Sequence, residues 1–166
     1  MLNKINILAP FFEDCYRELS IREYSREMKV SPPTASKILK NCSDNGFLLK
    51  RDHRGFLFFK VNRENKIMQD LSRIYWGTKL KNLFDFLETY FPKAIVLFGS
   101  LSKLEGRKES DVDIALFGVD KKINLEKFEK ELKREIHLFF YDSFEKVNKE
   151  LRPAILNGYL ARGYLS

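Results

Sequence analysis

Two short apolar segments, residues 94–98 and 112–117, most constrain what this chain can fold into. Each is a run of five or six mainly branched or aromatic residues, a pattern that predicts a buried strand. The first segment ends at a Gly-Ser pair, and an Asp-x-Asp sequence stands at the start of the second. The chain therefore carries polar residues where one buried strand ends and the next begins.

The polar residues at these ends suit a bound polyphosphate. Asp111 and Asp113 are two positions apart, so on a strand their carboxylates project to the same side. Two neighbouring negative charges are costly without a counter-ion, and hard oxygen ligands suit Mg²⁺. Gly99 allows the backbone to approach phosphate oxygens closely, and Ser100 offers a hydroxyl and an N–H as donors. Together they predict a site for a metal-bound polyphosphate.

The charge of the chain is unevenly distributed. The 166 residues carry a net charge of +7, and 44% of them are hydrophobic, enough for a packed core in one domain or two small ones. Residues 17–63 hold 11 Lys or Arg against 5 Asp or Glu, whereas residues 67–166 hold 17 against 15. A basic excess in the first third favours a nucleic-acid-binding module joined to a second module.

The cysteines and histidines do not indicate a zinc site. Cys15 and Cys42 stand far apart, and His53 and His137 are the only histidines, so no metal-ligand spacing is present. Two buried thiols are the simpler interpretation. We identify neither a signal peptide nor an apolar segment long enough to span a bilayer, and expect a soluble, cytoplasmic protein that binds no membrane.

The N-terminal third predicts three helices followed by a hairpin. Ser20 and Glu23 form a capping box, and Ser31 precedes two prolines that suit a helix start. The expected helices are 4–16, 20–28 and 31–44, and the expected strands are 47–50 and 55–61.

This order resembles a winged helix-turn-helix domain over residues 1–63. The resemblance implies double-stranded DNA as a partner, with the third helix in the major groove and the hairpin along the backbone. The implied DNA-binding residues are Thr34, Ser36, Lys37, Lys40, Asn41, Arg51 and Arg54. A winged helix used for protein docking or for a homodimer is the alternative.

The remaining chain predicts a helical connector over 64–77, interrupted at Gly77, and a further domain over 78–166. The expected helices there are 79–90, 125–134, 143–150 and 152–161, and the expected strands are 94–98, 112–117 and 136–140. Basic residues interleaved with glutamates up to Arg134 predict a solvent-exposed helix face.

The Gly-Ser pair, the ten intervening residues and the Asp-x-Asp resemble the nucleotidyltransferase superfamily that includes DNA polymerase beta, and most of all its minimal prokaryotic members. The resemblance implies an α+β chain in which a winged helix-turn-helix precedes a small nucleotidyltransferase domain with a short mixed sheet. It also implies that Gly99 and Ser100 hold the phosphates of ATP or another nucleoside triphosphate. Asp111 and Asp113 would then bind Mg²⁺, and Lys103 would neutralise the departing pyrophosphate.

Two positions depart from the family pattern. Members commonly carry a third carboxylate on the next strand, where this chain has His137 between apolar residues and Glu135 two positions earlier. Either Glu135 supplies the oxygen ligands, or His137 takes that place and favours a softer metal than Mg²⁺. Relatives also often have a glycine where this chain has Leu104, and the glycine here is Gly106.

Three functions agree with these patterns. The first is a magnesium-dependent nucleotidyltransferase with a DNA-binding regulatory domain, whose acceptor is unknown; by analogy, a HEPN-type partner toxin would be modified and the chain would act as an antitoxin that represses its own operon. The second is a transcriptional regulator whose nucleotidyltransferase domain is inactive or only senses a nucleotide. The third, a tailoring enzyme acting on a small molecule, leaves the basic N-terminal module without a role.

Overall fold

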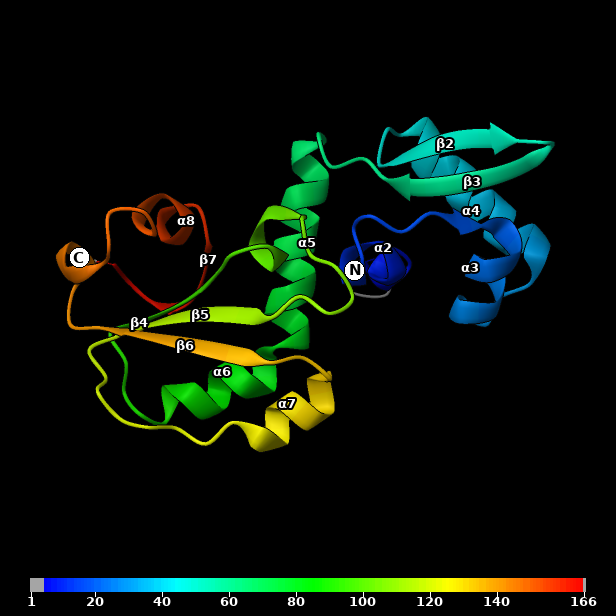
Figure 1. Ribbon diagram of the computed structural model, residues 1–166. Helices are drawn as coiled ribbons and strands as arrows, with labels where there is room; N and C mark the ends of the chain where they lie inside the picture. Colours follow the sequence, from blue (N-terminus) through cyan, green and yellow to red (C-terminus); the bar gives the residue numbers. More distant parts are fainter. Residues whose placement is uncertain (1–4, 166) are drawn as a thin grey trace. The chain divides into compact units, whose positions relative to one another are not determined.

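The computed structural model describes residues 5–165 and divides into two compact units (Figure 1). The first unit extends to Tyr75 and also includes Leu104–Lys108, whereas the second comprises Trp76–Lys103 and the residues from Glu109 onward. The chain therefore passes between the units at three points. No helix within residues 5–165 is both long and apolar enough to cross a membrane.

The helices of the first unit include α2 (Ala9–Glu13), α3 (Ile21–Met28) and α4 (Pro32–Asp44). The predicted extents of α3 and α4 are confirmed within one or two residues. The predicted helix over 4–16 is confirmed only in part, because residues 5–6 and 9–13 are helical but a turn at residues 7–8 separates them. Residue 4 lies outside the described residues, and α2 is short because it starts beside a proline and ends where Asp14 becomes extended, with φ −143° and ψ 99°.

Local sequence explains why α3 and α4 begin where they do. Ser20 Oγ accepts a hydrogen bond from the backbone N–H of Glu23, and the Glu23 carboxylate accepts one from the backbone N–H of Ser20 at 2.8 Å. This confirms the predicted capping box. Ser31 caps α4 in the same way, since its Oγ accepts from the Thr34 N–H at 3.3 Å.

A three-stranded antiparallel sheet completes the first unit, with β1 (Leu19–Ser20), β2 (Leu48–His53) and β3 (Phe56–Val61) in the order β1-β3-β2. The hairpin was predicted: β2 extends three residues further toward the tip than expected, β3 matches its expected bounds within one residue, and β1 was not predicted. Its two residues are too few to show a period, and only pairing with β3 makes them a strand. Leu19 and Phe59 are fully buried in the core of this unit, as are Phe11, Phe12 and Leu39.

Helix α5 (Lys66–Lys79) runs through Gly77 without a break, so the predicted interruption is wrong. A glycine weakens a helix but does not end one unless the surroundings favour another conformation. A Cβ built on Gly77 would lie 2.6 Å from the Tyr159 hydroxyl oxygen. The glycine at this position is therefore explained by close packing rather than by a turn.

The second unit is built on a four-stranded mixed sheet, β4 (Ala94–Phe98), β5 (Val112–Phe117), β6 (Ile136–Tyr141) and β7 (Tyr159–Gly163), in the order β6-β5-β4-β7. Figure 1 shows α6 (Lys81–Glu88) and α7 (Glu126–Leu132) on one face and α8 (Arg152–Leu156) on the other. Strand β5 is antiparallel to β4 and parallel to β6. The predicted strands β4 and β5 are confirmed at their full lengths, and β6 is one residue longer than predicted.

The two predicted C-terminal helices are largely wrong. Residues 143–150 contain only a single 3-10 turn, η2 (Phe144–Lys146), and the predicted helix 152–161 is the short α8 followed by β7. Strand β7 pairs antiparallel with β4 and has a register shift between Ile95 and Val96. The sequence of β7 has no clear period of two, and its pairing with the buried β4 decides its conformation.

Candidate active site

The Gly-Ser pair forms a tight bend directly after β4. Gly99 has a φ of +74°, in the left-handed region that favours glycine, and a 3-10 turn, η1 (Leu101–Lys103), follows. The Ser102 hydroxyl donates to the Gly99 carbonyl at 3.0 Å, and the Lys103 N–H donates to the Ser100 carbonyl at 3.2 Å. These two hydrogen bonds, both within residues 99–103, stabilise the bend.

The second aspartate lies directly against this bend. Asp113 is the register partner of Phe98 on β4, and a Cβ built on Gly99 would come within 2.2 Å of the Asp113 Oδ2 atom. Burial is the largest cause that raises the pKa of Asp113 above its usual range; His137 opposes the rise, and the charge of Asp111 adds to it. The structure therefore places a carboxylate beside the bend where added negative charge is unfavourable and a cation is favoured.

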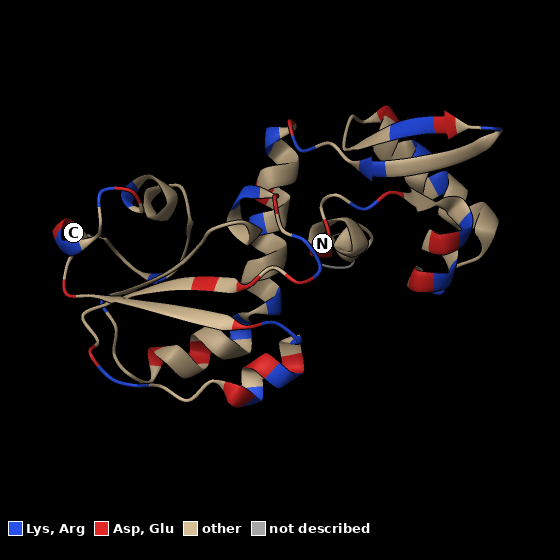
Figure 2. Ribbon diagram, in the orientation of Figure 1, with Lys and Arg blue, Asp and Glu red and all other residues tan. Residues whose placement is uncertain are grey.

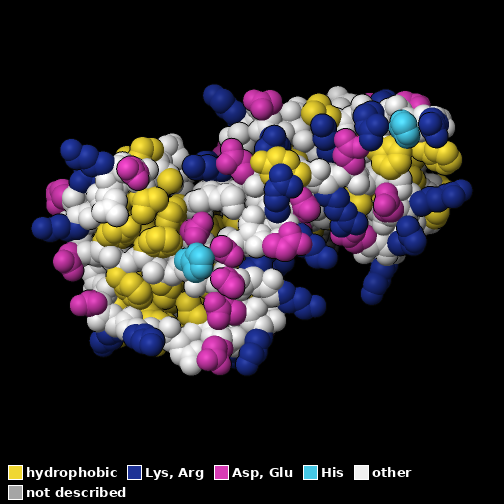
Figure 3. Space-filling model, in the orientation of Figure 1, with side chains coloured by type: hydrophobic (Ala, Val, Ile, Leu, Met, Phe, Trp, Pro, Cys, Tyr) yellow, Lys and Arg dark blue, Asp and Glu magenta, His cyan; other side chains and the backbone are white. Residues whose placement is uncertain are grey.

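His137 lies beside both aspartates. It is the parallel register partner of Asp113, and its Nδ1 atom is 3.7 Å from Asp113 Oδ1 and 3.9 Å from Asp111 Oδ2. The imidazole is about half exposed, at 48%. Figure 3 shows acidic side chains gathered around the histidine of the second unit. The two aspartates and this imidazole therefore share one face at one end of the sheet.

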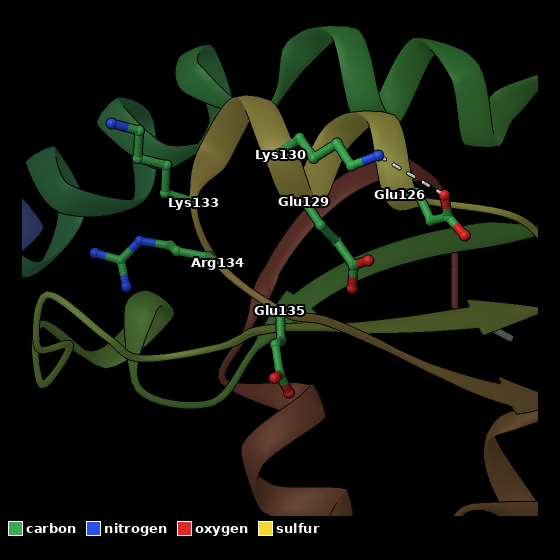
Figure 4. A pocket seen from close by; sticks show the side chains of 6 residues that line it. All are labelled: Glu126, Glu129, Lys130, Lys133, Arg134 and Glu135. Atoms are coloured by element: carbon green, nitrogen blue, oxygen red, sulfur yellow. Dashed lines mark ion pairs between the residues drawn. The ribbon is translucent and has the colours of Figure 1, made fainter.

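The Glu135 carboxylate lies beside the other ring nitrogen of His137. Its Oε2 atom is 3.6 Å from His137 Nε2, and its side chain is 79% exposed. Figure 4 shows Glu135 pointing away from the α7 side chains with which it lines a hollow of about 360 Å³, among them Glu126 and Glu129. Of the two residues considered for the third position, His137 is the one that faces both aspartates.

Arg134 holds the residue that precedes Asp111, a role that the sequence did not indicate. Its guanidinium donates to the Ser110 carbonyl and lies 5.1 Å from the centre of the Trp76 ring. Only 6% of Arg134 is exposed, so its assignment to a solvent-exposed helix face is wrong. Arg134 follows the end of α7. Because basic and acidic residues alternate through α7 up to Arg134, the sequence around this residue did not indicate burial.

Leu104 occupies a backbone conformation that glycine adopts more easily. Its φ is +58°, which costs a residue with a side chain about 1–2 kcal/mol. Its side chain is fully buried in the core of the first unit, and burying a leucine contributes about 1.5–3 kcal/mol. Burial of the side chain therefore offsets a cost of similar size in backbone strain, which accounts for a leucine at this position.

The donor types at this site suit a divalent cation. Two carboxylates and one imidazole share a face, and a cation would stabilise the charged form of the half-buried Asp113 carboxylate. Within residues 5–165, no three His, Cys, Asp or Glu side chains are close enough to hold a metal ion as they stand. The side chains of Asp111, Asp113 and His137 would therefore have to rotate inward to share one ion.

The predicted DNA-binding residues lie on α4 and on the β2–β3 hairpin. Figure 2 shows lysine and arginine on both elements. Lys37, Lys40 and Asn41 are exposed on α4, whereas Ser36 is half-buried. The Thr34 hydroxyl bonds to that of Ser31, and the Asn41 side chain accepts from Asn45. On the hairpin, Arg54 forms the turn, and Arg51 pairs with Glu18 at 2.6 Å.

Residues 79–158 match the family model described as polymerase beta, nucleotidyltransferase. The match spans η1 and the strands β4, β5 and β6, and so includes both parts of the predicted motif. It supports placing this part of the chain in the nucleotidyltransferase superfamily and indicates nucleotidyl transfer as its general chemistry. Neither the curated proteins nor the solved structures include a significant match to the chain.

Proposed function

We propose that this protein is a divalent-metal-dependent nucleotidyltransferase that transfers the nucleoside monophosphate of ATP, or of another nucleoside triphosphate, to an acceptor hydroxyl. One observation carries the proposal: Asp113 lies against the Gly99 bend on the face that it shares with Asp111 and His137. A phosphate-binding bend and a cation-binding acid pair are thereby adjacent. The family match over residues 79–158 supports the same chemistry.

The residues at the bend would bind the triphosphate. The Ser100 hydroxyl and the N–H groups after Gly99 donate to phosphate oxygens. Lys103 is exposed and follows Ser100 by three residues, and its ammonium group neutralises charge on the leaving pyrophosphate. The acceptor oxygen attacks the α-phosphorus as the bond to the bridging oxygen of the β-phosphate breaks. Pyrophosphate leaves, and the acceptor hydroxyl loses its proton.

Asp111, Asp113 and His137 would hold the cation. When bound, a divalent ion stabilises negative charge on the attacking and leaving oxygens of such a displacement. His137 takes the place of a third carboxylate and supplies nitrogen, a donor that suits Mn²⁺ and softer ions better than Mg²⁺. We assign Glu135 a supporting contact to His137 Nε2, which orients the ring so that Nδ1 faces the aspartates.

The metal preference tests the assignment of His137. In the native protein we expect Mn²⁺ to support nucleotide binding and pyrophosphate release better than Mg²⁺. His137→Asp should strengthen Mg²⁺ binding by roughly tenfold, the low end of effects seen around metal ligands. Titration of Mn²⁺ by electron paramagnetic resonance, with Mg²⁺ as competitor, measures the affinity of the native protein and the variant for each metal ion, and pyrophosphate release with each ion is measured separately. Equal preferences in the native protein and the variant would contradict the assignment.

Nucleotidyl transfer itself is tested with nucleoside triphosphates labelled at the α-phosphate. Pyrophosphate release together with label on the chain, on a co-purified protein or on a small-molecule acceptor establishes a transferase and identifies the class of acceptor. Metal-dependent binding of nucleotide without pyrophosphate release would instead support the nucleotide-sensing alternative. Absence of binding with every nucleotide and with both metals would exclude the proposed function.

Binding of double-stranded DNA by the first unit is a second candidate function. Its support is the exposed Lys37 and Lys40 on a helix that a serine caps and two prolines begin, within the basic part of the chain. We expect Lys37→Ala and Lys40→Ala each to weaken duplex binding and to reduce the salt slope by about one. The matched control is Lys66→Ala at the start of α5. If neither α4 variant changes affinity at any salt concentration, the helix does not contact DNA.

A further inference from the structure

The loop between Ser100 and Asp111, which joins the two parts of the candidate site, does not belong wholly to the second unit. Its central residues, Leu104–Lys108, group with the first unit, whereas Lys103 and Glu109 on either side group with the second. If the whole loop packed against the second unit, all of its residues would group with that unit. These five residues make three contacts within the first unit.

The first two contacts are a buried side chain and a backbone hydrogen bond. Leu104 is 0% exposed and belongs to the core cluster that includes Phe11 and Phe12. Two residues on, the buried Gly106 accepts a hydrogen bond from the backbone N–H of Cys15 at 2.8 Å. The loop is therefore fixed both by its side chain and by its backbone.

The third contact is made by Arg107 with an aromatic side chain. Its guanidinium carbon lies 4.0 Å from the centre of the Tyr16 ring, within the range of a cation–π interaction. Arg63 also lies over this ring, at 4.3 Å, and donates to the Tyr16 hydroxyl at 2.7 Å. Tyr16 thus binds two arginines, through its ring and its hydroxyl.

We infer that these contacts position the candidate site, so that nucleotide binding in the second unit depends on Tyr16 and Leu104 in the first. Lys103 immediately precedes Leu104, and Asp111 follows Lys108 by three residues. Each residue spans at most about 3.6 Å, so the connection between Lys108 and Asp111 is short. We therefore expect a displacement of Leu104–Lys108 to displace Asp111 as well. Linkage is reciprocal, so nucleotide binding also stabilises the anchored loop. This inference rests on the proposed binding of nucleotide at Gly99.

Tyr16 offers a matched pair of variants. Tyr16→Leu removes the ring that Arg107 contacts, whereas Tyr16→Phe retains the ring and loses only the hydroxyl that Arg63 contacts. Since Tyr16 is 40% exposed, both proteins should fold. We expect Tyr16→Leu to weaken the binding of a non-hydrolysable ATP analogue with Mn²⁺ by about three- to tenfold, and Tyr16→Phe to change it less than twofold.

Hydrogen exchange on the full-length chain separates the inference from the proposed function. Tyr16→Leu should accelerate amide exchange over residues 104–113, including Val112, whose N–H donates to the Glu135 carbonyl at 2.9 Å. Faster exchange confined to residues 104–108, or no change at all, overturns the inference even where the native protein binds nucleotide. A native protein that binds no nucleotide refutes the proposed function, and exchange unchanged at 109–113 then refutes the positioning role as well.

Discussion

Asp113→Asn is expected to lower the rate of nucleotidyl transfer by at least about 10³-fold, because it removes a charge that would hold the proposed cation while it keeps the shape of the side chain. The Asp113 side chain lies against the Gly99 bend, where we propose that the triphosphate binds. Pyrophosphate release under saturating metal measures the effect. The matched control is Asp120→Asn, an exposed carboxylate beyond the end of β5, which should retain full activity.

The same substitution should not destabilise the fold. Burial raises the pKa of Asp113 above its unfolded value, so its contribution to stability is greatest at low pH and is lost as the pH rises through the raised pKa. An uncharged asparagine avoids this loss. The melting temperature of the variant without metal should therefore equal or exceed that of the native protein near pH 7, with a smaller difference near pH 3. A variant that keeps a tenth of the native rate would contradict the assigned role.

Gly99→Ala is expected to lower both stability and activity. The φ of +74° is strained for alanine, and the new Cβ would meet the Asp113 carboxylate at 2.2 Å. Together these effects should cost about 3 kcal/mol of unfolding free energy. Displacing Asp113 by about 1 Å should lower the transfer rate by about 10²-fold. Denaturant unfolding and pyrophosphate release measure the two effects.

Gly55→Ala separates the two causes. Gly55 has a φ of +79°, close to that of Gly99, but a Cβ built there meets nothing within 4 Å. It should therefore show only the backbone strain, about 1 kcal/mol, and no loss of transfer activity. If Gly99→Ala costs no more than Gly55→Ala, then Asp113 moves freely and does not lie fixed against the bend.

Elements of the fold could be predicted where the residues of one short segment were enough to indicate its conformation. The capping box at Ser20 and the serine before two prolines at Ser31 predicted the starts of α3 and α4, because capping depends on neighbouring residues alone. The apolar runs of β4 and β5 were long enough to identify both strands. Helix α2 is shorter than its apolar pattern indicated, because it starts beside a proline and ends where Asp14 becomes extended. Strand β1 was missed because its two residues are too few to carry a pattern.

Elements whose conformation depends on distant partners were not predicted. Strand β7 is fixed by its pairing with β4, and helix α5 continues through Gly77, which packs close to Tyr159. The burial of Arg134 was not predicted either, because the surrounding sequence alternates in charge whereas its partners, Trp76 and the Ser110 carbonyl, lie far away in the chain. All of these contacts join residues that are too far apart in the sequence for local propensity or periodicity to indicate them.

For the candidate site, the sequence alone determined the donor groups and their order along the chain, because strand periodicity places Asp111 and Asp113 on one side. Only the tertiary structure decided that His137 rather than Glu135 faces both of them, since this depends on the parallel register of β5 and β6. It also decided that Leu104 is buried in the first unit. Contacts between residues far apart in the chain depend on how the strands and helices pack, and no local pattern records them.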